Sequence, residues 1–206
     1  MADVKVDLRP YRPQDLDALY RIALATGDSG RDASAMHVDP RLVGHLYVAP
    51  YAVLAPETAF VAEDAEGVCG YIVGARDTHA FEKRLEADWW PALRAAYPDP
   101  GPDAPQSADK RLIQQIHRPP RTPRRIAEPC PSHLHINLLP RLQGLGVGRR
   151  MIDLWLQTLR AMGSPAVHLG VSTANHRATI FYRAYGFREV ERLPAPYDLI
   201  WFALDL

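Results

Sequence analysis

The sequence predicts an α/β fold in which strands and helices alternate along the chain. Segments with apolar residues at every second position are interleaved with segments in which apolar residues recur every three or four positions. Hydrophobic residues make up 47% of the 206 positions, which is ample for a packed core. With no internal repeat and no long linker, residues 1–206 are expected to form a single domain.

The N-terminal part predicts one strand and two helices. Residues 4–8 alternate like a strand, and Pro13 opens a helix over residues 13–25 with Gly27 past its end. The pair Asp39-Pro40 provides an N-cap and a first-turn proline, so a second helix is expected to begin there and to be stopped by Pro50.

The next part predicts a hairpin and a long helix. Residues 59–63 and 68–75 form two strands around a turn at residues 65–67. A helix face follows, which Pro91 must kink or break; its apolar members are Phe81, Leu85, Trp89, Leu93 and Tyr97.

Residues 133–162 read as a strand, a glycine-rich turn and a helix. Leu134, Ile136 and Leu138 alternate with polar residues, and a helical period begins at Val147. Such a turn leaves backbone N–H groups without partners at the positive end of the helix dipole. It therefore predicts an anion site suited to a pyrophosphate, beside the charges of Arg149 and Arg150.

The spacing of the glycines narrows the choice of phosphate ligand. The dinucleotide fingerprint does not fit, because its third glycine falls one residue early and no acidic residue closes the strand at 167–171. A P-loop is excluded because no Lys-Ser/Thr pair follows the glycines. The pattern Q-x-x-G-x-G at Gln143, Gly146 and Gly148 resembles the coenzyme A pyrophosphate motif of the GNAT superfamily of N-acetyltransferases.

A second segment strengthens this resemblance. Residues 175–187 read N-x-x-A-x-x-F-Y-x-x-x-G-F, a helix ended by Gly186, and strands are expected at 187–193 and 199–204. The order of elements is similar to that of a GNAT domain, which implies a central twisted mixed sheet flanked by helices. The stretches ALYRIALATGDSGRDAS, GHLYVAPYAVLAPE and EDAEGVCGYIVG also resemble the acetyltransferase-like C-terminal domain of O-GlcNAcases and its free-standing bacterial relatives.

The resemblance implies acetyl-CoA as cosubstrate and a primary amine of an unknown acceptor, either a small molecule or a protein lysine, as substrate. It implies Tyr182 as the acid that protonates the leaving thiolate, and an oxyanion donor near Leu138 and Leu139. The coenzyme-binding residues it implies are Leu138, Leu139, Gln143, Gly144, Leu145, Gly146, Val147, Gly148, Arg149, Asn175 and Tyr182. The animal domain has a degraded pyrophosphate motif, so a non-catalytic acetyl-CoA-binding or interaction module is the alternative.

The base that accepts the amine proton has a candidate on the strand before the turn. His133, His135 and Asn137 share one strand face, and His135 is the candidate base because histidine titrates near ~6.5. The alternative is a polar strand face that only lines the pocket. Cys130, His133 and His135 lack a further ligand cluster, so no metal is expected.

Residues 98–131 hold nine of the nineteen prolines and six basic residues between Lys110 and Arg125. This segment is either a solvated surface excursion or a flap that attracts an acidic acceptor or the coenzyme phosphates.

Net charge and hydropathy limit the kinds of partner and the location that we expect for the protein. The formal net charge is zero, so nucleic acid is not an expected partner. No apolar run reaches ~18 residues and no signal-peptide core is present, so we expect a cytoplasmic protein without a membrane partner. A homodimer is left open.

Overall fold

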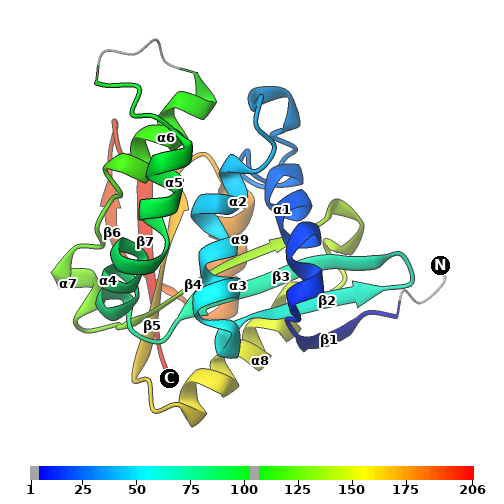
Figure 1. The fold of residues 1–206 in the computed structure, drawn as a ribbon. Coiled ribbons are helices and arrows are strands. Elements are labelled where there is room, and N and C mark those ends of the chain that lie inside the picture. The colour runs from blue at the N-terminus through cyan, green and yellow to red at the C-terminus, as the bar shows by residue number, and fades with distance from the viewer. Residues whose placement is uncertain (1–4, 103–106) are drawn as a thin grey trace.

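Seven strands form one sheet in the computed structural model, which describes residues 5–102 and 107–206 (Figure 1). Their order across the sheet is β1-β2-β3-β4-β5-β7-β6. Only the β4–β5 pair is parallel among these described strands, so the sheet is mixed, as the resemblance implied. The strands are β1 (Asp7–Pro10), β2 (Phe60–Asp64), β3 (Gly67–Ala75), β4 (Ser132–Leu138), β5 (Ala166–Ser172), β6 (Arg188–Leu193) and β7 (Leu199–Asp205).

The parallel pair at the centre of the sheet is short. β4 and β5 are in register only at Ser132 with Val167 and His133 with His168. Beyond these pairs β4 continues along β3 as far as Leu138, while β5 stays with β7. The two strands therefore separate toward their carboxyl ends and leave an opening in the sheet.

Helices cover both faces of the sheet. They are α1 (Leu16–Ala25), α2 (Leu42–Tyr47), α3 (Ala49–Leu54), α4 (Thr78–Asp88), α5 (Trp90–Ala96), α6 (Ala108–His117), α7 (Arg124–Ala127), α8 (Val147–Ala161) and α9 (His176–Tyr185). One core cluster packs residues of α1 to α6 against the sheet, and the other packs residues of α8 and α9. β4 contributes Leu134 to the α8–α9 side, while the alternate residues His133 and His135 face the other side, toward Tyr51 of α3.

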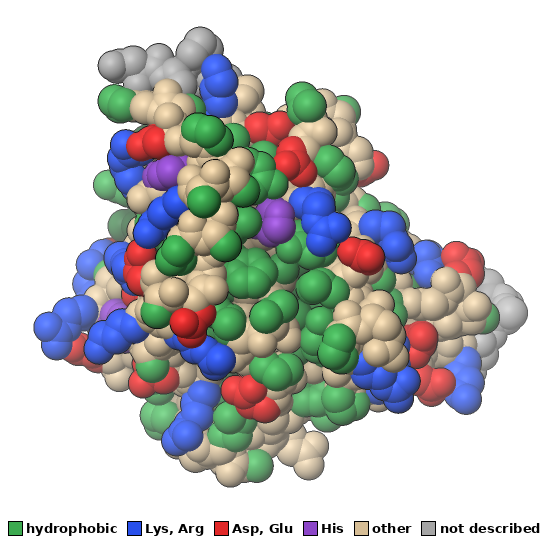
Figure 2. Space-filling view, in the orientation of Figure 1, with side chains coloured by type: hydrophobic (Ala, Val, Ile, Leu, Met, Phe, Trp, Pro, Cys, Tyr) green, Lys and Arg blue, Asp and Glu red, His purple; other side chains and the backbone are tan. Residues whose placement is uncertain are grey.

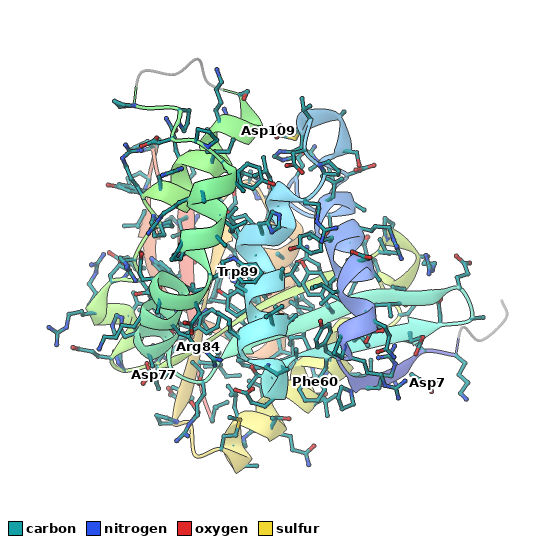
Figure 3. The ribbon with its side chains drawn as sticks, in the orientation of Figure 1. Asp7, Phe60, Asp77, Arg84, Trp89 and Asp109 are labelled. Atoms are coloured by element: carbon teal, nitrogen blue, oxygen red, sulfur yellow. The ribbon has the colours of Figure 1, made fainter. Side chains whose placement is uncertain are left out.

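The two prolines expected to interrupt helices act differently. Pro91 lies in the first turn of α5, and the break falls at Trp89 between α4 and α5, as predicted. The indole N–H of Trp89 donates to the carbonyl of His45 at 2.9 Å and ties this break to α2 (Figure 3). Pro50 does not stop a helix, so that prediction is wrong: it lies in the first turn of α3, where its missing N–H is not needed.

The proline-rich segment is partly a packed element. Its interpretation as a solvated excursion is wrong for α6 and α7, because Ile116 is 0% exposed and Ile126 is 3% exposed. Ile116 belongs to the core of the α1–α6 face. Residues 103–106 of this segment lie outside the described part.

The first strand runs over Asp7–Pro10 rather than 4–8, and the helix expected from Pro13 begins at Leu16, after a 3-10 turn over Pro13–Asp15. The N-cap of α2 is Arg41 rather than Asp39, so that prediction is wrong. The other predicted elements agree with the structure within about two residues. Val4, where the first strand was expected to begin, lies outside the described residues. None of the helices in the described part is long and apolar enough to cross a membrane.

Candidate active site

The glycine-rich turn forms an open cradle at the start of α8. Gly144 and Gly146 have φ values of +80° and +74°, in the left-handed region that favours glycine. A Cβ added at either residue would meet nothing within 4 Å, so the space above the turn is open. The N–H groups from Val147 to Arg149 are the first of the helix and have no intrahelical partner. These features fit a pyrophosphate.

Side chains brace this turn against its neighbours. The amide nitrogen of Gln143 donates to the carbonyl of Leu138 at 3.2 Å, and its oxygen accepts from the guanidinium of Arg177 on α9. Arg149 lies 5.1 Å above the ring of Tyr185, whereas Arg150 donates to the carbonyl of Val6. Arg177, which the sequence analysis did not single out, thus adds a positive charge beside the turn.

The two candidate oxyanion donors differ in availability. The N–H of Leu139 donates to the carbonyl of Cys69 at 2.9 Å. In an antiparallel ladder hydrogen-bonded and non-hydrogen-bonded pairs alternate, so the next pair, Leu138 with Gly70, is of the second kind. The N–H of Leu138 therefore points away from β3, toward the opening beside β5, and is the better placed of the two.

Helix α9 positions Asn175 and Tyr182. The side-chain oxygen of Asn175 caps the helix by accepting from the N–H of Ala178 at 3.1 Å. Tyr182 is 7% exposed, with its ring centroid 5.4 Å from that of Phe187 and 6.1 Å from that of Phe202. Burial raises the pKa of Tyr182, so its phenol is protonated at neutral pH.

A cavity of about 310 Å³ lies beside the opening, on the face covered by α1 to α6. Figure 2 shows hydrophobic side chains gathered near the centre of one face of the molecule, with charged side chains around them. Rings and prolines dominate the lining of the cavity, which includes Tyr47, Tyr51, Phe81, Trp90, Pro119, Pro120 and Trp201. Its polar members include His133, His135, His168, Glu82, Gln115, Arg121 and Thr122.

A chain of hydrogen bonds fixes the protonation of the histidines. The hydroxyl of Thr78 donates to the carbonyl of Pro131, so it must accept from Nδ1 of His133 at 2.8 Å. Nε2 of the neutral His133 then accepts from the hydroxyl of Tyr51 at 2.9 Å. The oxygen of Tyr51 accepts in turn from Nε2 of His135 at 3.1 Å. Because Nε2 of His135 is the donor, its Nδ1 carries the lone pair and can accept a hydrogen bond.

The three histidines are uncharged near pH 7. Burial, with a smaller effect of His168, lowers the pKa of His135 to about 4. Burial and the two neighbouring histidines hold the pKa of His133 well below its usual value, and burial also lowers that of His168. His135 can thus accept a hydrogen bond through Nδ1, but it is a weak base.

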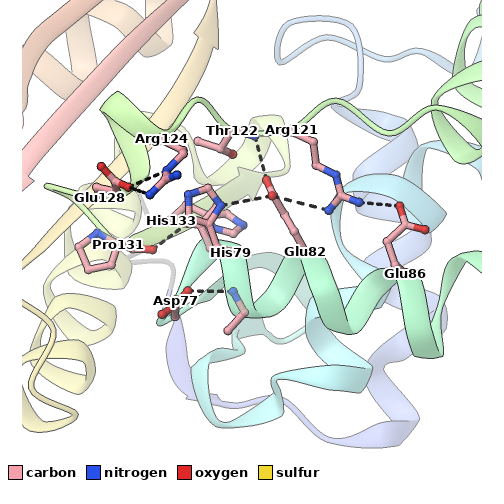
Figure 4. Close-up of polar contacts among 12 residues, drawn as sticks. Asp77, His79, Glu82, Glu86, Arg121, Thr122, Arg124, Glu128, Pro131 and His133 are labelled. Atoms are coloured by element: carbon pink, nitrogen blue, oxygen red, sulfur yellow. Dashed lines mark hydrogen bonds and ion pairs between the residues drawn. The ribbon is translucent and has the colours of Figure 1, made fainter.

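The loop before α7 forms one side of the cavity and is bonded to α4 (Figure 4). The N–H of Thr122 donates to Oε1 of Glu82 on α4 at 2.8 Å. Arg121 donates to Oε1 of Glu86 at 2.8 Å and lies 3.7 Å from Oε2 of Glu82. We call residues 118–123, between α6 and α7, the strap.

The predicted site residues divide between the two sides of the opening. His135 lines the cavity, whereas Tyr182 and the glycine turn belong to the α8–α9 side. The sequence analysis missed Tyr51, Glu82 and Trp201, although Tyr47 and Tyr51 share a spacing of four residues. Within residues 5–102 and 107–206, no group of three or more His, Cys, Asp or Glu residues is arranged to hold a metal ion.

Comparison with known proteins agrees with the fold. The crystal structure of SsHAT superposes with a TM-score of 0.87 at 35% identity, covering 97% of this chain and 98% of that one. The structure of yncA from Salmonella typhimurium with its cofactor acetyl-CoA superposes with a TM-score of 0.56 at 14% identity, covering 97% and 93% of the two chains.

Protein O-GlcNAcase of Rattus norvegicus and that of Mus musculus are each 26% identical over 195 residues, which is 94% of this chain. The chain spans about a fifth of the length of these curated relatives, namely 21%.

The family model described as "Acetyltransferase (GNAT) family" matches residues 17–187, from α1 to the end of the second motif. The chain therefore belongs to the GNAT family of acetyltransferases.

Proposed function

We propose that the chain transfers the acetyl group of acetyl-CoA directly to a primary amine held in the cavity. The observation that carries the proposal is the opening between β4 and β5, which has the glycine turn and α9 on one side and the cavity on the other. An amine in the cavity could reach a thioester in the opening without first forming an acyl-enzyme.

Acetyl-CoA supplies an activated acetyl group when it is bound. The cradle at Gly144 and Gly146, with the first N–H groups of α8, would hold its pyrophosphate. The amide of Asn175 has N–H donors left for the pantetheine arm, since its oxygen caps α9. The N–H of Leu138 would donate to the developing oxyanion.

Two side chains would handle protons. Tyr182 stays protonated at neutral pH and would donate its proton to the leaving thiolate. Nδ1 of His135 would accept the proton that the amine nitrogen loses after attack, when that nitrogen is strongly acidic. The Thr78–His133–Tyr51 chain would hold this ring in the accepting tautomer.

Calorimetry and a thiol-release assay test the proposal. We expect acetyl-CoA to bind with a micromolar Kd, and a panel of amines to include one that releases free coenzyme A thiol. Cys69 and Cys130, the two cysteines of the chain, are buried, so a thiol reagent should have a low background. No acetyl-CoA binding would refute the proposal, and binding without turnover of any amine would favour a non-catalytic coenzyme-binding module.

A further inference from the structure

We infer that the acceptor is a small aromatic amine that is uncharged at neutral pH. This inference rests on the proposed function and deepens it by giving the substrate a chemical class. The shape of the cavity, its charge and the requirements of proton transfer support it.

The walls of the cavity suit a flat ring. Tyr51 and Phe81 stack with their centroids 4.5 Å apart, and Pro119 and Pro120 line the strap side. Trp90, which is 5% exposed, adds a further ring. The volume of about 310 Å³ is at the small end for ligand sites, so it favours a molecule of one or two rings.

The charge of the cavity does not favour a cation. Among the described residues that line it, Glu82 is the acidic one and Arg121 the basic one, and they lie 3.7 Å apart. Glu82 also accepts from the N–H of Thr122, so its carboxylate is already occupied. A polyamine or another polycation would lose its hydration without gaining an unpaired carboxylate.

The requirements of proton transfer also favour an amine that is neutral before it binds. An alkylammonium has a pKa near ~10 and would have to lose a proton before it could attack. His135, the candidate acceptor of that proton, has its pKa lowered to about 4, far too low for this step. An aromatic amine is already neutral, because its lone pair is delocalised into the ring.

The balance of the reaction is then simple. The amine nitrogen bonds to the acetyl carbon and the C–S bond breaks. The nitrogen loses one proton to Nδ1 of His135, the thiolate gains one from Tyr182, and solvent returns the proton from His135 to Tyr182.

The experiment that tests the inference compares aniline with cyclohexylamine, two amines of similar size and different basicity, by thiol release from acetyl-CoA. We expect kcat/KM for aniline to exceed that for cyclohexylamine at least tenfold at pH 7 and to stay flat from pH 7 to 9. A preference for cyclohexylamine would overturn the inference and leave the proposed function standing. If acetyl-CoA binds but neither these nor other amines react, both fail.

Discussion

Tyr182 and His135 lie on opposite sides of the β4–β5 opening. This arrangement suits the two proposed roles, Tyr182 as the acid for the leaving thiolate and His135 as the acceptor of the amine proton. Tyr182→Phe removes only a hydroxyl from a packed ring, so folding and acetyl-CoA affinity should survive. We expect kcat to fall by roughly 10²–10⁴, the usual contribution of a general acid. Steady-state kinetics with an accepted amine measure this.

Tyr185→Phe is the control on the same helix. The hydroxyl of Tyr185 donates to Asp153 at 2.5 Å on the protein surface, so its loss should leave kcat unchanged. Equal turnover by the Tyr182→Phe and Tyr185→Phe variants, with chemistry rate-limiting, would reduce Tyr182 to a packing residue.

The histidine cluster predicts an acid-sensitive fold. The pKa of His135 is lowered to about 4 in the folded state, against ~6.5 in the unfolded chain, so the unfolded state binds more protons between these values. Stability should therefore fall as the pH drops from about 6.5 toward 4, with a slope of up to ~1.4 kcal/mol per pH unit for this residue. Urea unfolding at several pH values measures the slope.

His135→Gln should make that slope shallower, because one titrating group is removed. His176→Gln, at an exposed position on α9, should leave it unchanged. A slope that is the same in the wild type and in His135→Gln would contradict the prediction.

At the scale of elements, α8 carries two glycines with the same backbone conformation at its two ends. Gly146 before the helix and Gly163 after it both have φ +74°, and a Cβ at either would meet nothing within 4 Å. Gly146→Val and Gly163→Val should thus lose similar stability, about 1–2 kcal/mol each, from left-handed strain. Only Gly146→Val should lose acetyl-CoA affinity, by tenfold or more in calorimetry. Equal affinities would show that the turn is not the pyrophosphate site.

How far an element could be predicted depended on how local its causes are. The helix α8 and the strand β4 were found because their apolar periods lie within the segment itself. The role of Pro50 was predicted wrongly because a proline is found both after the end of a helix and in the first turn of the next one, so the residue alone does not distinguish the two positions. Leu138 and Leu139 could not be told apart, since the strand pairing that occupies the N–H of Leu139 comes from β3, seventy residues earlier in sequence.

At the scale of the whole molecule, the cavity is assembled from residues that are far apart in the chain. Tyr51 reaches His133 and His135 across 82 and 84 residues, and Thr122 reaches Glu82 across 40. No periodicity or motif links such positions. The sequence could therefore predict the glycine-rich turn, which is one continuous segment, but not the composition of the cavity.

The strap, residues 118–123, borders the cavity and is bonded to α4, so we expect it to control access of the amine to the cavity. Arg121→Glu would place a third carboxylate beside Glu82 and Glu86 and release this contact. We expect the KM for the amine to rise several-fold while the Kd for acetyl-CoA stays the same. The melting temperature should move by only a few degrees, because the side chain of Arg121 is 49% exposed and such ion pairs contribute about 0–1 kcal/mol.

Arg124→Glu is the matched control, because Arg124 is 84% exposed and its ion pair is local, with Glu128 just past the end of α7. Its amine KM and melting temperature should both match those of the wild type. If Arg121→Glu instead unfolds the protein at room temperature, the strap is a part of the core on which folding depends. If both variants bind the amine as the wild type does, the strap does not control access to the cavity.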